Sequence, residues 1–183
     1  MSELDIRLRA VTAADIDLFR RLATEPGLVG PNWYGFRDAE AAQRRFDTDG
    51  WLGPDDGRLM VAVDDDTAGL VSWFATGVAL TKYWNIGITL LPDWRGRGVG
   101  WRAQAILCDY LFAHTPVERL EAGTQPDNIA EQKALVKAGF THEGVLRSAA
   151  VLPDSIPTSS MECRAGAYRD VWVYGRLRSD PYP

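Results

Sequence analysis

A strand followed by a glycine-rich turn and a helix is the part of this sequence best suited to chemistry. The apolar run Tyr83–Leu91 predicts a strand that ends at Pro92-Asp93. After the turn, Trp101–His114 contains no proline or glycine and is predicted to be a helix. The residues between these two elements are Arg95, Gly96, Arg97, Gly98, Val99 and Gly100.

Such a turn is suited to binding a phosphate group. Glycines allow the backbone to approach a ligand closely and to adopt positive φ. The first amides of a helix have no partner within the helix, and the helix dipole adds partial positive charge there. A pyrophosphate can accept hydrogen bonds from these amides, and Arg95 and Arg97 can add charge-assisted bonds. A solvated surface turn is the alternative interpretation.

Three phosphate-binding patterns can be compared with this turn. A Walker loop ends in Gly-Lys-Ser/Thr, which is absent here. A dinucleotide loop requires Gly-x-Gly-x-x-Gly and an acidic residue about 20 positions further on. Glu121 lies at a suitable distance, but the third glycine comes one residue early. The third pattern, Arg/Gln-x-x-Gly-x-Gly/Ala after a strand, is matched at every position by Arg95, Gly98 and Gly100.

Length, composition and charge narrow the class of protein. The 183 residues are enough for a single domain, expected at 1–178, with a short tail at 179–183. The apolar content of 46% is ordinary for a globular protein, and no apolar run reaches membrane-spanning length. The net charge of −5 argues against general nucleic-acid binding. The N-terminal residues do not resemble an export signal, and two cysteines make no disulfide framework, so a cytoplasmic location is expected.

Neither a metal centre nor a covalent nucleophile is expected. The two histidines and two cysteines do not have the spacing of metal ligands. The acidic run Asp64-Asp65-Asp66 falls at the tip of a predicted hairpin, where a solvated turn is the simpler interpretation. The sequence contains no Gly-x-Ser-x-Gly motif.

The hydrophobic patterns predict an α+β domain, a mixed twisted sheet of about seven strands with helices on both faces. The expected order is β-α-α-β-β-β-α-β-α-β-β. Strands are expected at Leu4–Val11, Arg58–Val63, Ala68–Gly77, Tyr83–Leu91, Val117–Thr124, Phe140–Leu152 and Ala165–Arg178. Helices are expected from Thr12 to about Glu25 and at Ala39–Thr48, Trp101–His114 and Ile129–Ala138.

In this order and in its motifs the sequence resembles the GNAT superfamily of N-acetyltransferases, whose acyl-CoA pyrophosphate loop has the third pattern above. Asn128 precedes the last helix as the family's asparagine does. Gly139-Phe140, Glu143-Gly144 and Arg147 resemble the family's Gly-Phe-x-x-Glu-Gly-x-x-Arg segment. Arg169-Asp170-x-x-x-Tyr174 resembles the closing segment of the ribosomal-protein-alanine (RimJ/RimL-like) branch. The resemblance covers nearly the whole chain.

The resemblance implies transfer of an acetyl group from acetyl-CoA to a primary amine, by direct attack through a tetrahedral intermediate. The segment Arg95–Gly100, called the coenzyme loop from here on, would bind the pyrophosphate. The pantetheine arm would lie along the strand Ile86–Leu91, which in the family splays from Val117–Thr124 to leave a cleft. Asn128 would hold the arm from the far side, and the backbone N–H of Leu90 would stabilise the oxyanion.

The proton-transfer groups are the open part of this assignment. Glu121 is the first candidate base, although the pattern allows either face of its strand, and Asp93 and Glu40 are the other candidates. The branch's usual serine is replaced by Glu131, and the tyrosine of other members by Leu135, so no leaving-group acid is assigned. A coenzyme A thiolate is a tolerable leaving group near neutral pH, so a strong acid is not required.

The acceptor is an amine of a small molecule or of a protein N-terminus. The loops Pro26–Arg37 and Pro153–Arg164 are expected to select it, with Trp33 and Tyr34 as candidate substrate-binding residues, although packing on the domain's own edge is the alternative. No membrane or nucleic-acid partner is expected, and the last strand could pair across a homodimer. Two other functions stay open. One is a nucleotide-binding oxidoreductase of the NAD type with Glu121 on a ribose, and the other is a non-catalytic acyl-CoA-binding or interaction domain.

Overall fold

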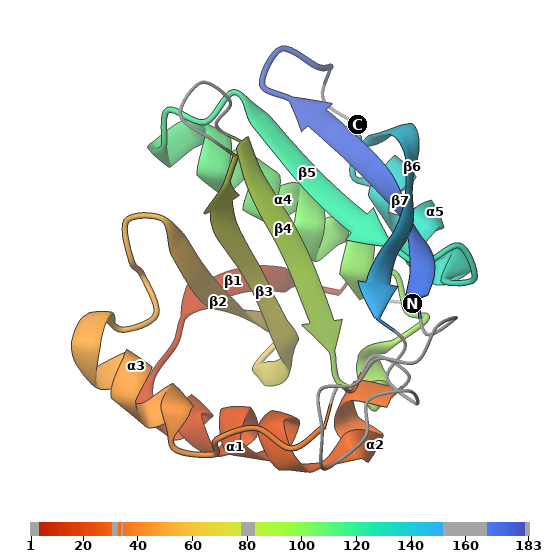
Figure 1. The fold of residues 1–183 in the computed structure, drawn as a ribbon. Helices are drawn as coiled ribbons and strands as arrows, with labels where there is room; N and C mark the ends of the chain where they lie inside the picture. The colour runs from red at the N-terminus through yellow and green to blue at the C-terminus, as the bar shows by residue number, and fades with distance from the viewer. Residues whose placement is uncertain (1–3, 31–32, 34, 78–82, 152–167, 182–183) are drawn as a thin grey trace.

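The computed structural model describes residues 4–30, 33, 35–77, 83–151 and 168–181. These residues form a mixed sheet of seven strands in the order β1-β2-β3-β4-β5-β7-β6 (Figure 1). The strands are β1 (Ile6–Ala10), β2 (Asp56–Val63), β3 (Asp66–Thr76), β4 (Tyr83–Leu90), β5 (Arg119–Thr124), β6 (Thr141–Val151) and β7 (Tyr168–Leu177). The predicted α+β class and strand number are therefore confirmed.

The helices follow the predicted order, with one addition. They are α1 (Ile16–Thr24), preceded by the short 3-10 helix η1 (Ala13–Asp15), α2 (Pro26–Val29), α3 (Ala41–Asp49), α4 (Val99–His114) and α5 (Ile129–Lys137); a further 3-10 turn, η3, spans Pro92–Trp94. The sequence predicts a loop throughout Pro26–Arg37, but the first residues of this segment form α2. Proline at the first helical position has its φ already set for a helix.

Two helix starts differ from the sequence prediction for local reasons. Helix α3 begins at Ala41 and not at Ala39, because the Asp38 carboxylate accepts a hydrogen bond from the Glu40 amide in a turn before the helix. Helix α4 begins at Val99, two residues before the predicted start, because Gly98 supplies the left-handed N-cap conformation. The predicted connection at 78–82, the loop at 153–164 and the first residues of the last strand lie outside the described residues.

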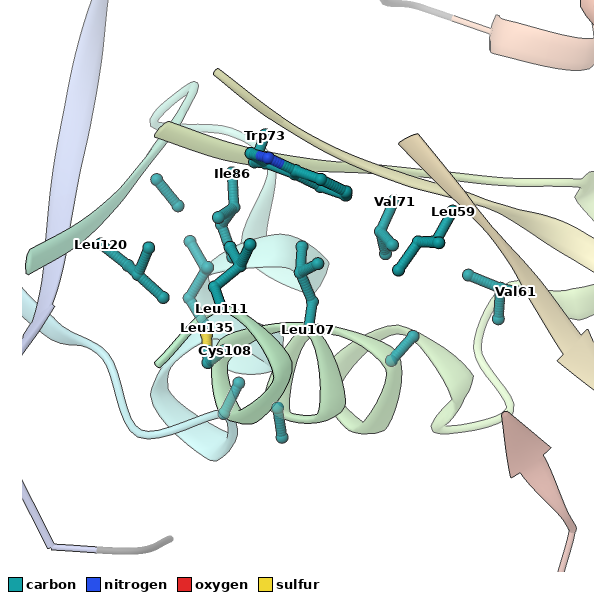
Figure 2. Packing of buried hydrophobic residues seen from close by; sticks show 14 of the residues in the cluster. Leu59, Val61, Val71, Trp73, Ile86, Leu107, Cys108, Leu111, Leu120 and Leu135 are labelled. Atoms are coloured by element: carbon teal, nitrogen blue, oxygen red, sulfur yellow. The ribbon is translucent and has the colours of Figure 1, made fainter. Parts of the chain in front are cut away.

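One face of the sheet is covered by α4 and α5, and the main core lies beneath them. The α4 side chains Leu107, Cys108 and Leu111 are fully buried against the sheet, where Val71 and Trp73 meet them (Figure 2). Burying an aliphatic side chain of this size contributes about 1.5–3 kcal/mol relative to exposure. This packing fixes the direction of α4, and therefore the place where its N-terminus opens. It also confirms Cys108 as a core residue, with burial raising the pKa of its thiol to about 12.

The opposite face is covered by α1 and α3 over the first three strands. Phe19 and Leu22 of α1 pack on Met60 and Leu70, and the Phe19 ring stacks on Trp51 at 5.1 Å between centroids. The helix start is fixed by Asp15. Burial opposes the charge of this carboxylate, but hydrogen bonds from Arg9 and Thr12 outweigh the burial and lower its pKa to about 2.

The sheet separates in its middle, between β4 and β5. These strands run parallel and pair at only two positions, Trp84 with Leu120 and Asn85 with Glu121. Figure 1 shows the two strands side by side at one end and well apart at the other. On its other side, β4 pairs with β3 along its whole length, from Tyr83 to Leu90. The expected splay is thus confirmed, and it leaves one edge of β4 without a partner strand from Ile86 onward.

Candidate functional site

A cleft of about 750 Å³ lies where β4 and β5 diverge. Its two walls come from different elements. The first wall is the end of β4, the coenzyme loop and the start of α4, which contribute Ile88, Thr89, Leu90, Arg95, Gly96, Gly98, Gly100 and Trp101. The second wall is the segment before α5 and one side of that helix, with Gln125, Asp127, Asn128, Ala130, Glu131, Lys133, Ala134 and Lys137.

The first wall presents backbone amides. The Leu91 N–H donates to Ala68 O of β3 at 2.9 Å, so the preceding amide, that of Leu90, points away from β3 and into the cleft. The amide of Ile88 lies on the same edge, because strand amides alternate in direction. The edge therefore resembles a sheet edge ready to accept another extended chain.

The coenzyme loop brings the N-terminus of α4 to the end of that edge. Gly96 and Gly98 have φ of 73° and 79°, a left-handed conformation that favours glycine. Gly98 is the N-cap, and it has no side chain with which to satisfy the first amides of this 16-residue helix. Gly100 lies beside the end of β4, since a Cβ built on it would be 3.6 Å from Leu90 Cδ1. An anion in this part of the cleft would meet open helix amides and the positive end of the helix dipole.

The side chains of the loop have mainly structural roles. The Arg95 guanidinium donates to Leu90 O at 2.9 Å and also to Leu28 O, so it fastens the loop to β4 and α2. Arg97 stacks over the Trp94 ring at 5.4 Å and is not among the residues that line the cleft. Val99 is fully buried in the main core. Of the predicted loop residues, Gly96, Gly98 and Gly100 line the cleft together with Arg95.

The second wall presents side chains. Asn128 is the N-cap of α5, and its Oδ1 accepts a hydrogen bond from the Glu131 amide at 3.3 Å. Lys133 and Lys137 bring positive charge to the same wall. Asp127 is paired with Arg169 of β7, with 2.7 Å between the two side chains. The structure thus places the predicted residue Asn128 across the cleft from the coenzyme loop.

Glu121 does not reach this cleft. It occupies the last position at which β5 pairs with β4, where its neighbours Leu120 and Ala122 point into the main core and its own side chain points to the opposite face. Its carboxylate pairs with Arg119 at 2.9 Å, and Arg119 also binds Glu143, whose pKa it lowers by hydrogen bonding. Glu121 therefore lies at the point where the strands begin to separate, held in an ion pair.

The two other carboxylates considered from the sequence are also outside the cleft lining. Asp93 is exposed in the turn η3, and Glu40 pairs with Arg20 of α1 at 3.0 Å. Trp33 is half-buried, and its ring meets Phe36 edge-on at 5.0 Å. Tyr34 lies outside the described residues. The predicted loop still borders the cleft, through Val29 and Arg37.

Within the described ranges, no group of three or more metal-ligating side chains is found, and no helix is long and apolar enough to cross a membrane. The acidic hairpin tip forms the predicted tight turn, with Val63 paired to Asp66 and Asp64 at a φ of 52°.

Sequence reasoning noted Glu131 only as a departure from a family pattern, but the structure places it in the second wall. Burial raises the pKa of its carboxyl group, and the nearby amide of Gln104 opposes that effect in part. Gln104 is itself 1% exposed. No sequence signal indicates this burial, because a glutamate in the first turn of a helix is usually solvated.

Comparison with known proteins shows the family to which this chain belongs. Residues 5–141 match the family model described as "Acetyltransferase (GNAT) domain", so the chain belongs to the GNAT acetyltransferase family. Among curated proteins it is similar to the probable N-acetyltransferase YjcK of Bacillus subtilis, with 35% identity over 91 residues. That alignment covers 49% of this chain and 49% of the relative, so the chain matches about half of the curated relative's length.

Solved structures share the fold over almost the whole chain. A spermidine N-acetyltransferase from Vibrio cholerae, in complex with coenzyme A and spermine, has a TM-score of 0.74 at 16% identity and covers 96% of both chains. The ribosomal-protein alpha-N-acetyltransferase RimL in complex with coenzyme A has a TM-score of 0.73 at 19% identity, covering 96% of this chain and 98% of its own. At these identities the likeness concerns the fold.

Proposed function

We propose that this protein transfers the acetyl group of acetyl-CoA to a primary amine of a small molecule or of a protein N-terminus. The observation that carries the proposal is the junction of β4 and α4. An uncapped helix N-terminus opens into the same cleft as the unpaired edge of the preceding strand. A ligand that carries a pyrophosphate at one end and an extended amide arm at the other matches both features.

In this proposal the backbone of the first wall binds the coenzyme. The amides of Gly98 through Gly100 receive the pyrophosphate, while Arg95 holds the loop in shape. The amide expected from the sequence to stabilise the oxyanion is that of Leu90, a residue whose side chain lies beside Gly100 and so at the phosphate end of the edge. The Ile88 amide is two residues, or about 7 Å, nearer to the point where the strands separate. It is the second candidate for polarising the thioester carbonyl.

On the second wall, Asn128 would contact the pantetheine arm. Its Oδ1 is used by the helix cap, which leaves the amide NH₂ group to donate to a ligand. The substrate amine would attack the thioester directly. Glu121 remains the sequence-based prediction for the base, and its carboxylate is held in an ion pair with Arg119.

The proposal also covers the acceptor, the location and the oligomeric state of the protein. A RimJ/RimL-like acceptor, that is a protein N-terminus, is supported by the Arg169-Asp170-x-x-x-Tyr174 segment and by the fold shared with RimL. A polyamine acceptor is supported equally by the fold shared with the spermidine enzyme. We also propose that the protein is cytoplasmic, because the proposed reaction needs a supply of acetyl-CoA. We further propose that the last strand pairs across a homodimer.

Two experiments test the proposal. Thermal unfolding with acetyl-CoA or NAD separates acyltransferase from oxidoreductase, and only acetyl-CoA is expected to raise the melting temperature. Release of free thiol is then measured with polyamines, amino acids, amino sugars and N-terminal peptides. Binding of acetyl-CoA without thiol release across this panel would favour the non-catalytic alternative. An oxidoreductase of the NAD type would need a mostly parallel sheet. Among the described strands, β4 and β5 form a parallel pair and the other pairs are antiparallel, which argues against that alternative.

A further inference from the structure

A half-buried arginine lies on the face of the sheet opposite α4. Arg58 of β2 comes directly before Leu59, which belongs to the main core, and two residues before Met60, which faces α1 and α3. Because side chains alternate along a strand, Arg58 points with Met60 toward α1 and α3. Its guanidinium lies over the Trp51 ring at 4.4 Å and over the Phe19 ring at 5.7 Å. These two rings therefore hold the guanidinium in place by packing.

Arg58 has no carboxylate partner of its own. Its side chain forms no hydrogen bond or ion pair with the residues that the structure describes. Asp56, on the same strand, is bonded to Arg45 at 2.8 Å, and Arg45 also holds Asp49. Burial lowers the pKa of the Arg58 guanidinium, and repulsion by nearby Arg37 lowers it further. The group thus contains three arginines and two aspartates, and an anion between Arg37 and Arg58 would offset their repulsion.

Arg37 brings this positive charge to the cleft. Its backbone amide donates to Ala23 O at 3.1 Å, which fixes residue 37 beside the end of α1. The residue is exposed and lines the cleft. Arg95 also lines the cleft but is engaged by carbonyl oxygens, and Arg169 is paired with Asp127. Of the arginines among the described lining residues, Arg37 is therefore the one whose guanidinium is left for a ligand.

A row of small and polar residues leads from Arg58 to the open edge of β4. Arg58 pairs with Ser72 of β3, and Ser72 pairs with Gly87 of β4, so the three positions share one face of the sheet. A Cβ built on Gly87 would lie 3.2 Å from Ser72 Oγ, so the glycine leaves space above the strands. Two strand spacings, about 10 Å, separate Arg58 from Gly87. A ligand lying along this row would reach β4 next to the Ile88 amide on the open edge.

We propose that Arg37 and Arg58 bind a carboxylate of the acceptor, so that the acceptor is an amine that also carries an acidic group. The inference rests on the proposed acetyltransferase function and names the class of amine. The amine would lie at the open edge of β4, and the carboxylate would lie toward β2. Guanidinium groups bind carboxylates through paired, charge-assisted hydrogen bonds. The same two arginines would repel a polyamine, which carries only positive charge. A free amino acid and a peptide with an acidic residue near its N-terminus both satisfy this chemistry.

The test compares acceptors that differ in this charge alone. One pair is β-alanine and its amide, the other is the dipeptide amides of Ala-Asp and Ala-Asn, and spermidine is a further acceptor. Thiol release at saturating acetyl-CoA gives kcat/KM for each. We expect the parent chain to prefer the acidic member of at least one pair by about tenfold or more, the effect of a hydrogen bond between charged groups. The pair that shows the preference distinguishes a free amino acid from a peptide. Equal rates within both pairs, or a faster reaction with spermidine, would overturn the proposal.

The variant Arg58→Met keeps most of the length of the side chain, and its packing on the two rings, while removing the charge. It should bring the preference for the acidic acceptor to within about threefold, mainly through KM. The Kd for coenzyme A, measured by calorimetry, should stay within about threefold of the parent value. Arg58→Lys should retain part of the preference. Arg21→Met serves as the matched control, because Arg21 is exposed on α1 and paired with Glu25. An unchanged preference in Arg58→Met would contradict the assignment.

Two further measurements do not depend on the folding of an Arg58 variant. Arg37→Met changes an exposed residue and should lower the same preference by about threefold or more. Raising the ionic strength of the parent assay from about 0.05 M to about 0.5 M should also lower it, since salt screens exposed charges. A preference that neither change alters would count against the two arginines. Absence of thiol release with every amine tested would instead overturn the proposed function.

Discussion

The two walls of the cleft present different kinds of chemical group, backbone on one side and side chains on the other. On the β4 side, peptide groups face the cleft, and the side chains of Arg95, Arg97 and Val99 hold the loop in shape or pack elsewhere. On the α5 side, Asn128 and Glu131 face the cleft with their side chains. The first wall therefore depends on backbone conformation, and is changed most by placing a side chain on a glycine. The second wall depends on functional groups, and is changed by conservative replacements of them.

The largest effect is expected from forcing the first wall out of shape. Gly98→Val places a β-branched residue at a φ of 79°, with a strain of about 1–3 kcal/mol. If the loop shifts to relieve that strain, the Kd for coenzyme A should rise about 10–100-fold. The control, Arg97→Ala, removes a charge that does not line the cleft and should change the Kd by less than about threefold. Calorimetric titration measures both, and the reverse ranking would mean that charge governs the wall.

The next largest effect is expected on the free energy of unfolding, with no change in coenzyme binding. Asp15→Asn, on the face of the sheet opposite α4, should lower the free energy of unfolding at neutral pH by about 2 kcal/mol, from the shift of the Asp15 pKa from 3.8 to about 2. Because that pKa is depressed on folding, the stabilisation is present above pH 4 and is lost as pH falls from about 4 through 2. Urea unfolding between pH 2 and 7 measures it. A change in coenzyme affinity at neutral pH would contradict the independence of the two regions.

Asn128 tests the second wall with a matched pair of variants. Asn128→Ala should cost about 1 kcal/mol of stability through loss of the α5 cap, and should also weaken coenzyme A binding by about fivefold through loss of one hydrogen bond. Asn128→Ser keeps a capping oxygen, so it should recover the stability but not the affinity. Denaturation and calorimetry on the same samples distinguish the two contributions. Recovery of both by serine would assign the effect to the helix alone.

The smallest effect is expected at Glu121, outside both walls. Glu121→Gln leaves the geometry of the strand intact and breaks the ion pair with Arg119, so kcat should change by less than about twofold. Arg119 keeps its bond with Glu143 in the variant. The pH–rate profile provides the check, since a displaced acidic limb would assign the base to Glu121 after all.

Features that depend on neighbouring residues in the chain could be predicted from the sequence. Asp15 at the third position after Thr12 identified the first helix start, and the three closely spaced glycines identified a turn with positive φ before α4. The family-level inference was also possible, because the loop pattern consists of residues adjacent in the chain. These features need no knowledge of distant partners, and the structure confirms them.

What the sequence did not predict depends on contacts between distant segments. Arg176 is a charged residue that is 3% exposed, and it bonds the Ala138 carbonyl at the end of α5. Arg95 was expected to face a phosphate, yet its guanidinium is engaged by the carbonyls of Leu28 and Leu90. The enclosure of Glu131 likewise requires α4 to lie beside α5. Apart from Leu90, which is five residues before Arg95, these partners are distant in sequence, so periodicity and composition carry no information about them.

The separation of β4 from β5 has a mechanical consequence. The sheet behaves as two half-sheets, β1-β2-β3-β4 and β5-β7-β6. The seam at which these half-sheets pair directly consists of two residue pairs between β4 and β5. A long molecule bound along the open edge of β4 would hold the two half-sheets together. Occupancy of the cleft would then stiffen the whole domain, and the seam should be the first place where amide protons exchange when the cleft is empty.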